Sequence, residues 1–233
     1  SPFLSSPLSH TTPPLPPSFF FSHQQQLGLQ LLQEMARKGI RPDTQVFNAA
    51  ISACEKGRAW DTALKLMRQM RQLGCQPTAV TYGAAISACE KGLQWETALQ
   101  LLKQMPEDNL QPNTIVYSAA ISACGASGKW EEALNLFAEM EKARIPRNTI
   151  SYNAAIAACA KGKQWQPALA LFDRMAKAGV ARDRVTYNAV IRACERGGEY
   201  NLAMDLRMEA AGALGAPAAE GVVKDGGSAE QWD

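Results

Sequence analysis

Histidine is almost missing from this chain of 233 residues. The two histidines, His10 and His23, both lie within the first 25 residues, and no Cys-x-x-Cys pair occurs in the sequence. A zinc-dependent deaminase needs a His-x-Glu motif together with a Cys-x-x-Cys motif, and a hydrolytic triad needs a histidine as its base. A glycine-rich phosphate loop is also missing. The sequence therefore argues against an enzyme and predicts neither a metal nor a cofactor.

Long apolar runs are missing as well. No run approaches the ~18 residues that a membrane-spanning helix needs, so we expect no membrane partner. The formal net charge is only +2, from 24 Lys and Arg against 22 Asp and Glu. This charge is far below that of a protein that binds nucleic acid without sequence preference, although a mildly basic surface fits a polyanionic partner.

The feature that organises the rest of the sequence is an internal repeat with a period of 35 residues. Its first full copy is residues 44–78, and the four copies that follow are 79–113, 114–148, 149–183 and 184–218. The register shows in the aromatic residue of each copy, which is Phe47, Tyr82, Tyr117, Tyr152 or Tyr187. A fixed period of this length predicts an array of one supersecondary unit.

Each unit is predicted to be a pair of helices. Apolar residues recur in the first half at i, i+3, i+4 and i+7, which is one face of a helix. In the first unit they are Phe47, Ala50, Ile51 and Cys54, and the stripe of the second half is Trp60, Ala63, Leu64, Met67 and Met70. Such a hairpin has apolar flanks on both sides and buries them only against neighbouring hairpins. The sequence therefore predicts an all-α fold, an α-solenoid.

Glycines are expected to end these helices. Gly74 and Pro77 are placed to close the second helix of the first unit. Another set stands directly after the predicted first helices, where we expect a residue in the left-handed conformation. This set is Gly57, Gly92, Gly162 and Gly197.

Five of the six cysteines occupy one position of the predicted first helix. Equivalent positions of stacked helix pairs lie about 10 Å apart, which is too far for a disulfide or a shared metal ion. We therefore predict small buried side chains. The five are Cys54, Cys89, Cys124, Cys159 and Cys194.

The repeated residues resemble the pentatricopeptide repeat. An aromatic residue and asparagine, as at Tyr152 and Asn153, are followed by a Trp-x-x-Ala-Leu segment and then by a Gly-x-x-Pro segment or its equivalent. The 35-residue period separates this pattern from the tetratricopeptide repeat, whose period is 34. The resemblance covers the five units and a half unit at 26–43, which supplies only a second helix. It implies a right-handed superhelix of stacked helix–turn–helix repeats.

The resemblance also implies a function. Repeats of this family bind single-stranded RNA and read one base per unit with two or three side chains. The family uses the residue directly after the aromatic residue together with the last residue of the unit. The corresponding pairs here are Asn48 with Thr78, Gly83 with Asn113, Ser118 with Asn148, Asn153 with Asp183, and Asn188 with Ala218.

Two further sets of residues follow from the same resemblance. An apolar residue three positions before the first base-reading residue wedges the base from the side; the set is Val80, Ile115, Ile150 and Val185, with Gln45 departing from it. A cation eight positions after that residue suits a phosphate contact; the set is Lys56, Lys91, Lys161 and Arg196, with Ala126 interrupting it.

Structural explanations stay open for several of these residues. The cations could instead stabilise the C-terminal ends of helices, and we expect the tryptophans to pack in the core rather than to stack on bases. The last residues of the units and Asp43 all precede a predicted helix, where they are good N-caps. Capping does not explain the asparagines inside the first turn, which are Asn48, Asn153 and Asn188.

Both ends of the chain are predicted to be disordered. Residues 1–25 are rich in Ser and Pro and contain no Asp, Glu, Lys or Arg, and residues 219–233 are rich in Gly. The first segment lacks acidic residues, as organelle targeting sequences do, but it also lacks their arginines. The half unit at 26–43 is also what a piece of a longer array would contain.

We therefore expect a non-enzymatic protein that binds single-stranded RNA with a sequence preference, and we expect no DNA partner. Family resemblance implies a chloroplast or mitochondrial location and a processing or editing enzyme recruited as a partner. The alternative is a helical-repeat scaffold for protein–protein interaction, since the concave surfaces of solenoids also bind peptides. A peptide groove should have exposed apolar or like-charged residues where this sequence has Asn, Ser and Gly.

Overall fold

The computed structural model describes residues 28, 30–35 and 37–214, and this part of the chain contains helices and no strand. The predictions for 1–25 and 219–233 lie outside the described residues. Residues 28, 30–35 and 37 are helical and belong to the predicted half unit. The helices that follow are α2 (Thr44–Lys56), α3 (Trp60–Gln72), α4 (Ala79–Lys91), α5 (Trp95–Gln104), α6 (Thr114–Ala126), α7 (Trp130–Lys142), α8 (Thr149–Lys161), α9 (Trp165–Lys177), α10 (Arg184–Gly197) and α11 (Tyr200–Leu214), with a short 3₁₀ helix, η1 (Pro106–Asp108), after α5.

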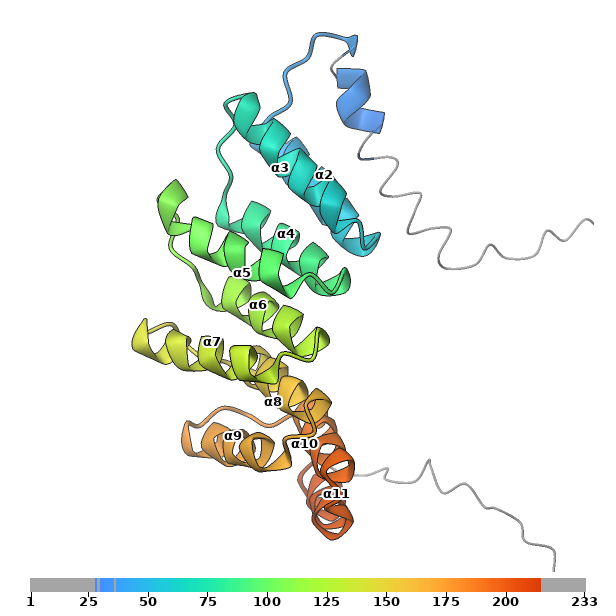
Figure 1. The fold of residues 1–233 in the computed structure, drawn as a ribbon, viewed down its shortest axis with the longest axis vertical. Helices are drawn as coiled ribbons and strands as arrows, with labels where there is room; N and C mark the ends of the chain where they lie inside the picture. Colours follow the sequence, from blue (N-terminus) through green and yellow to red (C-terminus); the bar gives the residue numbers. More distant parts are fainter. Residues whose placement is uncertain (1–27, 29, 36, 215–233) are drawn as a thin grey trace, which may run out of the picture.

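The helices alternate between two layers (Figure 1). The first helices of the units, α2, α4, α6, α8 and α10, pack against one another in chain order. Each of the helices α3, α5, α7 and α9 packs on the first helix of its own unit and on that of the next unit. Within the described residues the backbones of these second helices lie further apart, and a side-chain ion pair at 2.7 Å joins Glu141 of α7 to Arg174 of α9. The fold is therefore the predicted α-solenoid, with a continuous layer of first helices covered by separate second helices.

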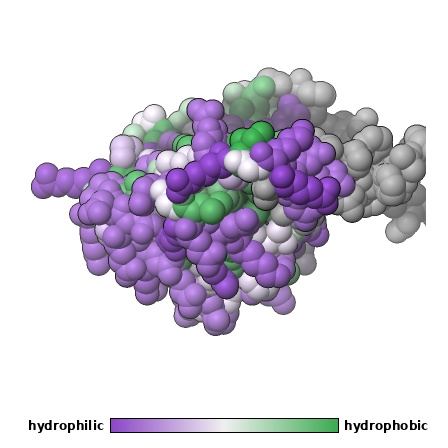
Figure 2. Space-filling model, turned by 90° about the horizontal axis from the view of Figure 1, so that it is seen from above, coloured by the Kyte–Doolittle hydropathy of each residue, from purple (hydrophilic) through white to green (hydrophobic). Residues whose placement is uncertain are grey.

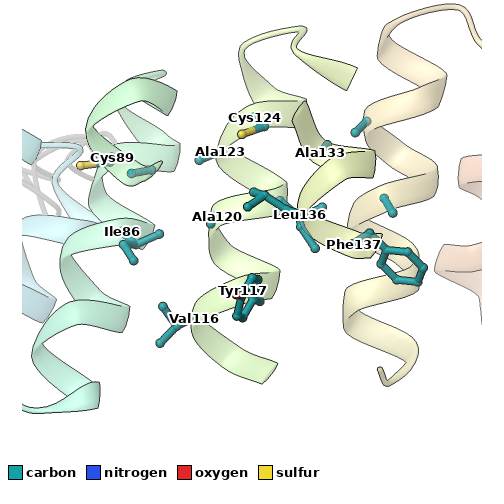
Figure 3. Packing of buried hydrophobic residues seen from close by; sticks show 14 of the residues in the cluster. Ile86, Cys89, Val116, Tyr117, Ala120, Ala123, Cys124, Ala133, Leu136 and Phe137 are labelled. Carbon is teal, nitrogen blue, oxygen red and sulfur yellow. The ribbon is translucent and has the colours of Figure 1, made fainter. Parts of the chain in front are cut away.

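The units bury their apolar flanks against their neighbours. Figure 3 shows Val116 and Ala120 of α6 directed toward Ile86 of α4, while Leu136 and Phe137 of α7 lie on the other side of α6. Full burial of a Val, Leu, Ile or Phe side chain contributes about 1.5–3 kcal/mol, so these surfaces between units stabilise the stack. Seen from the N-terminal end of the stack, the outer surface is mostly hydrophilic around a small hydrophobic area (Figure 2). No helix among residues 30–214 has both the length and the apolar character to span a bilayer.

The five repeated cysteines are small buried side chains, as predicted. All five are at most 1 % exposed and none is in a disulfide. Burial raises the pKa of the Cys89 thiol to about 11, and it does the same for Cys159. These thiols are therefore neutral at physiological pH and behave as small apolar groups.

The expected role of the glycines after the first helices is wrong. The φ angles of Gly57, Gly92 and Gly162 are −82°, −86° and −77°, which any residue can adopt. The left-handed residue is the next one in each unit, for example Leu93 with φ 58°. The chain turns one position later than expected. The remaining left-handed residues after the first helices are Arg58, Gly128, Lys163 and Gly198.

Three of these glycines, Gly92, Gly162 and Gly197, instead lie against the tryptophan of the preceding unit. A Cβ atom on Gly92 would overlap the ring of Trp60, and one on Gly162 would overlap the ring of Trp130. Gly197 and Trp165 form the same contact. The ring at the start of a second helix thus lies flat against the backbone at the end of the next first helix. Trp60, Trp95 and Trp165 are partly buried against the core, in agreement with the core packing that the sequence predicted.

Substituting Gly162 by alanine should destabilise the stack, because the new methyl group has to displace the Trp130 ring. Overpacking of this kind costs about 1–3 kcal/mol, so the midpoint of urea unfolding should fall. The matched control is Gly83→Ala inside α4, where a Cβ atom meets nothing within 4 Å. That change should be neutral or stabilise by up to about 1 kcal/mol, because alanine favours a helix over glycine. Equal effects of the two substitutions would contradict the proposed contact.

Candidate functional site

The last residue of each unit caps the first helix of the next unit. The side chain of Asp183 accepts the backbone N–H of Thr186 at 2.8 Å, and the other four caps make the equivalent bond. Capping, which the sequence left open, is therefore confirmed for the whole set. The other members are Asp43, Thr78, Asn113 and Asn148, with distances of 2.9, 3.4, 3.1 and 3.0 Å.

The structure brings together Asn153 and Asp183, which lie near the two ends of the fourth unit. The amide Nδ2 of Asn153 donates to Oδ1 of Asp183 at 3.1 Å, although the two residues are 30 positions apart. Partial burial raises the pKa of Asp183, but the hydrogen bonds from Thr186 and Asn153 outweigh that effect and leave the pKa below its ordinary value. The carboxylate is therefore ionised at neutral pH. Every bond recorded for it uses Oδ1, so Oδ2 stays available to accept from a ligand.

Asn48 and Thr78 form the same arrangement in the first unit. The Asn48 amide donates to the Thr78 hydroxyl at 3.4 Å, and it accepts from the hydroxyl of Thr81 at 2.5 Å. Both Asn48 and Thr78 are partly exposed. Two of the five predicted base-reading pairs are thus physical pairs, each with donor and acceptor atoms on the surface between neighbouring units.

The remaining predicted pairs are less complete. Gly83 offers no side chain beside Asn113. Ser118 is only 4 % exposed, and its hydroxyl donates to the backbone oxygen of Thr114 at 2.7 Å. Asn188 is exposed on α10, while its predicted partner Ala218 lies outside the described residues.

The four predicted wedge residues lie at the surface. Val80, Ile115, Ile150 and Val185 are 63, 72, 66 and 58 % exposed. Each stands at the second position of a first helix, three residues before the first base-reading position. Single exposed apolar side chains are ordinary, but a series at one position of four successive units forms an apolar row beside the polar pairs. Such a row suits flat, hydrophobic faces of a ligand.

The predicted phosphate-binding cations reach back to the preceding unit. Lys91 forms an ion pair with Glu55 at 2.9 Å, and Arg196 donates to the backbone oxygen of Ala160 at 3.5 Å. Lys161 donates to the backbone oxygen of Ala126, the last residue of α6. Lys56 is exposed at the end of α2. Two of the four cations therefore contact backbone oxygens in the last turn of a helix in the preceding unit, and Lys91 pairs with a side chain of that unit. Reasoning from one unit alone did not predict these contacts.

Sequence reasoning also missed the hydroxyls at the third position of the units. Thr81, Ser151 and Thr186 are fully buried, and each forms a capping box with the residue three positions before it. The signal was present in the sequence, since an N-cap followed three residues later by a polar side chain is typical of a capping box. Their contacts with the preceding unit could not be read from one unit alone.

Comparison with solved structures finds the same fold. The pentatricopeptide repeat protein PPR10 from maize matches with a TM-score of 0.67 and 24 % identity, over 88 % of this chain and 31 % of that one. PPR10 in complex with an 18-nt psaJ RNA element matches with a TM-score of 0.69 and 18 % identity, over 82 % and 30 % of the two chains. The present chain thus spans about a third of the PPR10 chain.

A third match is the PPR domain of Arabidopsis thaliana protein-only RNase P 1 in complex with tRNA. Its TM-score is 0.62 at 16 % identity, over 75 % of this chain and 92 % of that one. A search of curated protein sequences returns no match.

Family models agree with the structural comparison over most of the chain. The pentatricopeptide repeat domain model matches residues 30–91, the PPR repeat family model matches 112–161 and 147–196, and the PPR repeat model matches 80–110 and 185–210. These matches leave only residue 111 uncovered between residues 30 and 210. The chain therefore belongs to the pentatricopeptide repeat family.

Proposed function

We propose that this protein binds single-stranded RNA with a sequence preference. The observation that supports this most strongly is the pairing of Asn153 with Asp183 at 3.1 Å, because it places one free N–H and one free carboxylate oxygen side by side. Asp183 Oδ2 suits the N3–H of uracil, and the remaining Asn153 N–H suits an adjacent carbonyl of the same base. Two solved members of the family with this fold are RNA complexes.

The surroundings of the pair fit a nucleobase. The exposed side chain of Ile150 lies one helical turn before Asn153 and offers an apolar contact to a base face. In the family, Asn with Asp goes with uracil, and Ser with Asn, as at Ser118 and Asn148, goes with adenine. The preferred core is then A-U in consecutive positions, 5′ to 3′ as the chain runs from its N- to its C-terminus.

The first unit extends this preference less specifically. Asn48 with Thr78 favours a pyrimidine. Gly83 with Asn113 and Asn188 with Ala218 are too irregular to assign a base. The third unit is expected to select its base less strongly than the fourth. The buried Ser118 hydroxyl already donates its proton to the backbone oxygen of Thr114 and cannot donate it to a base.

We infer a steric mode of action without catalysis by this chain. A stack of five units covers about five nucleotides at one base per unit, which shields them from nucleases or keeps them unpaired. By analogy with the family, the RNA would be an organelle transcript in a chloroplast or mitochondrion, and an additional processing or editing enzyme would act on it.

Exchanging the base-reading pair of the fourth unit should change its base preference. The double variant Asn153→Ser, Asp183→Asn replaces the donor and the charged acceptor, so the preferred base should move from U toward A by about 1–3 kcal/mol. Fluorescence anisotropy with two RNAs that differ only at this base measures the ratio of affinities. An unchanged ratio would reject base reading by these residues and favour the protein–protein scaffold.

Replacing Lys161 by alanine separates phosphate binding from capping of the preceding unit. If Lys161 contacts phosphate, all RNAs should bind more weakly by the same factor, and the salt dependence should become slightly less steep. Lys142→Ala, at the end of α7 in the layer of second helices, is the matched control and should leave RNA binding unchanged. A lower melting temperature with unchanged RNA affinity would instead assign Lys161 to helix capping alone.

A further inference from the structure

A buried threonine hydroxyl contacts the asparagine of both pairs that the structure brings together, Asn48 with Thr78 and Asn153 with Asp183. The third residue of the unit is threonine at Thr81 and Thr186, whereas Val46 and Val116 occupy the same position in two other units. We propose that Thr186 is a positioning residue that sets base selectivity by fixing the orientation of the Asn153 amide, and that Thr81 does the same for Asn48. This inference rests on the proposed RNA-binding function.

The geometry places Thr186 between the two base-reading residues without exposing it. Its hydroxyl donates to Oδ1 of Asn153 at 2.7 Å and accepts from the backbone N–H of Asp183 at 3.1 Å. The residue is fully buried, so it has no access to RNA. Asn153 belongs to the fourth unit and Thr186 to the fifth, so the contact exists only in the assembled stack.

The charge of Asp183 decides which way the amide points. Its ionised carboxylate only accepts hydrogen bonds, so the group of Asn153 that faces it has to be the NH₂. The amide oxygen then faces the Thr186 hydroxyl, which has a single proton and lies within hydrogen-bond distance of both this oxygen, at 2.7 Å, and Oδ1 of Asp183, at 2.8 Å. Together the two contacts allow one orientation of the amide. In this orientation the oxygen is occupied inside the protein, and the group left for a base is an N–H donor.

The other units show the same coupling between the two positions. Thr81 donates to Oδ1 of Asn48 at 2.5 Å, as Thr186 does to Asn153. Where the third residue is Val116, the preceding unit has Gly83 in place of asparagine. Where it is Ser151, the hydroxyl bonds instead to the backbone oxygen of Asn148 at 2.8 Å. Within residues 37–214, the hydroxyl at the third position of a unit therefore bonds to the residue after the aromatic residue of the preceding unit only where that residue is asparagine.

Loss of this hydroxyl should affect selectivity more than affinity. Without it, the Asn153 amide keeps its bond to Asp183 but loses the second contact that holds it. Its remaining N–H is then no longer fixed in one place for a base. The wedge at Ile150 and the cations are unchanged, so a base is still bound but is discriminated less well.

The test compares Thr186→Val with Thr186→Ser in the full chain. Anisotropy gives the affinities for two RNAs that contain U or A at the base read by the fourth unit. The U-to-A affinity ratio should fall about tenfold in Thr186→Val, within the range for a hydrogen-bonded base edge, and Thr186→Ser should retain the parent ratio. Ser151→Ala is the matched control, because it removes a capping box without a contact to a base-reading side chain, and should leave the ratio unchanged.

Thr81→Val provides an independent test if Thr186→Val does not fold, as judged by circular dichroism. It should relax selectivity at the base read by the first unit only. A parent ratio retained by folded valine variants, with only a lower melting temperature, would make these threonines simple caps and overturn the inference. A parent protein with no preference between the two RNAs would instead overturn the proposed function itself.

Discussion

The structure depends on the packing of each first helix against the first helix of the next unit. A single helical hairpin has two apolar flanks and no core of its own, so each unit is stable only when neighbours cover both flanks. The contact between Trp130 and Gly162 fixes how one unit sits on the next, because the ring lies where any Cβ atom would be. The repetition of 35 residues places this contact at three unit boundaries, whereas Ser127 takes the place of the glycine in the third unit. An insertion within a unit would separate ring and glycine.

The same packing creates the candidate site. Asp183, the last residue of the fourth unit, caps α10 of the fifth unit and also bonds Asn153 of its own unit, so one residue serves both stability and the proposed base reading. Lys161, a proposed phosphate contact, likewise bonds the backbone oxygen of Ala126 at the end of α6 in the preceding unit. A site made between units changes whenever the distance between units changes. RNA affinity and the stability of the stack are therefore expected to be linked.

The sequence predicted features that depend on one unit alone. The helices, the buried cysteines and the N-caps follow from periodicity and from local hydrogen bonding, and the row that includes Ile150 follows from the family resemblance. Features that depend on two units were predicted wrongly or missed. Gly162 was assigned to a left-handed turn, because the ring that requires it lies 32 positions earlier in the chain. Ser118 was assigned to the base without its bond to Thr114, since a serine inside a helix often bonds back to its own backbone.

Selection from random single-stranded RNA by the full chain tests the central claim most directly. The pool should be partitioned on immobilised protein at moderate salt, and the retained sequences should be compared with the starting pool. If neighbouring units read successive bases, the retained RNAs should be enriched in A followed by U, with a pyrimidine two positions before the A. Retention of all sequences in their starting proportions would contradict base reading by this stack.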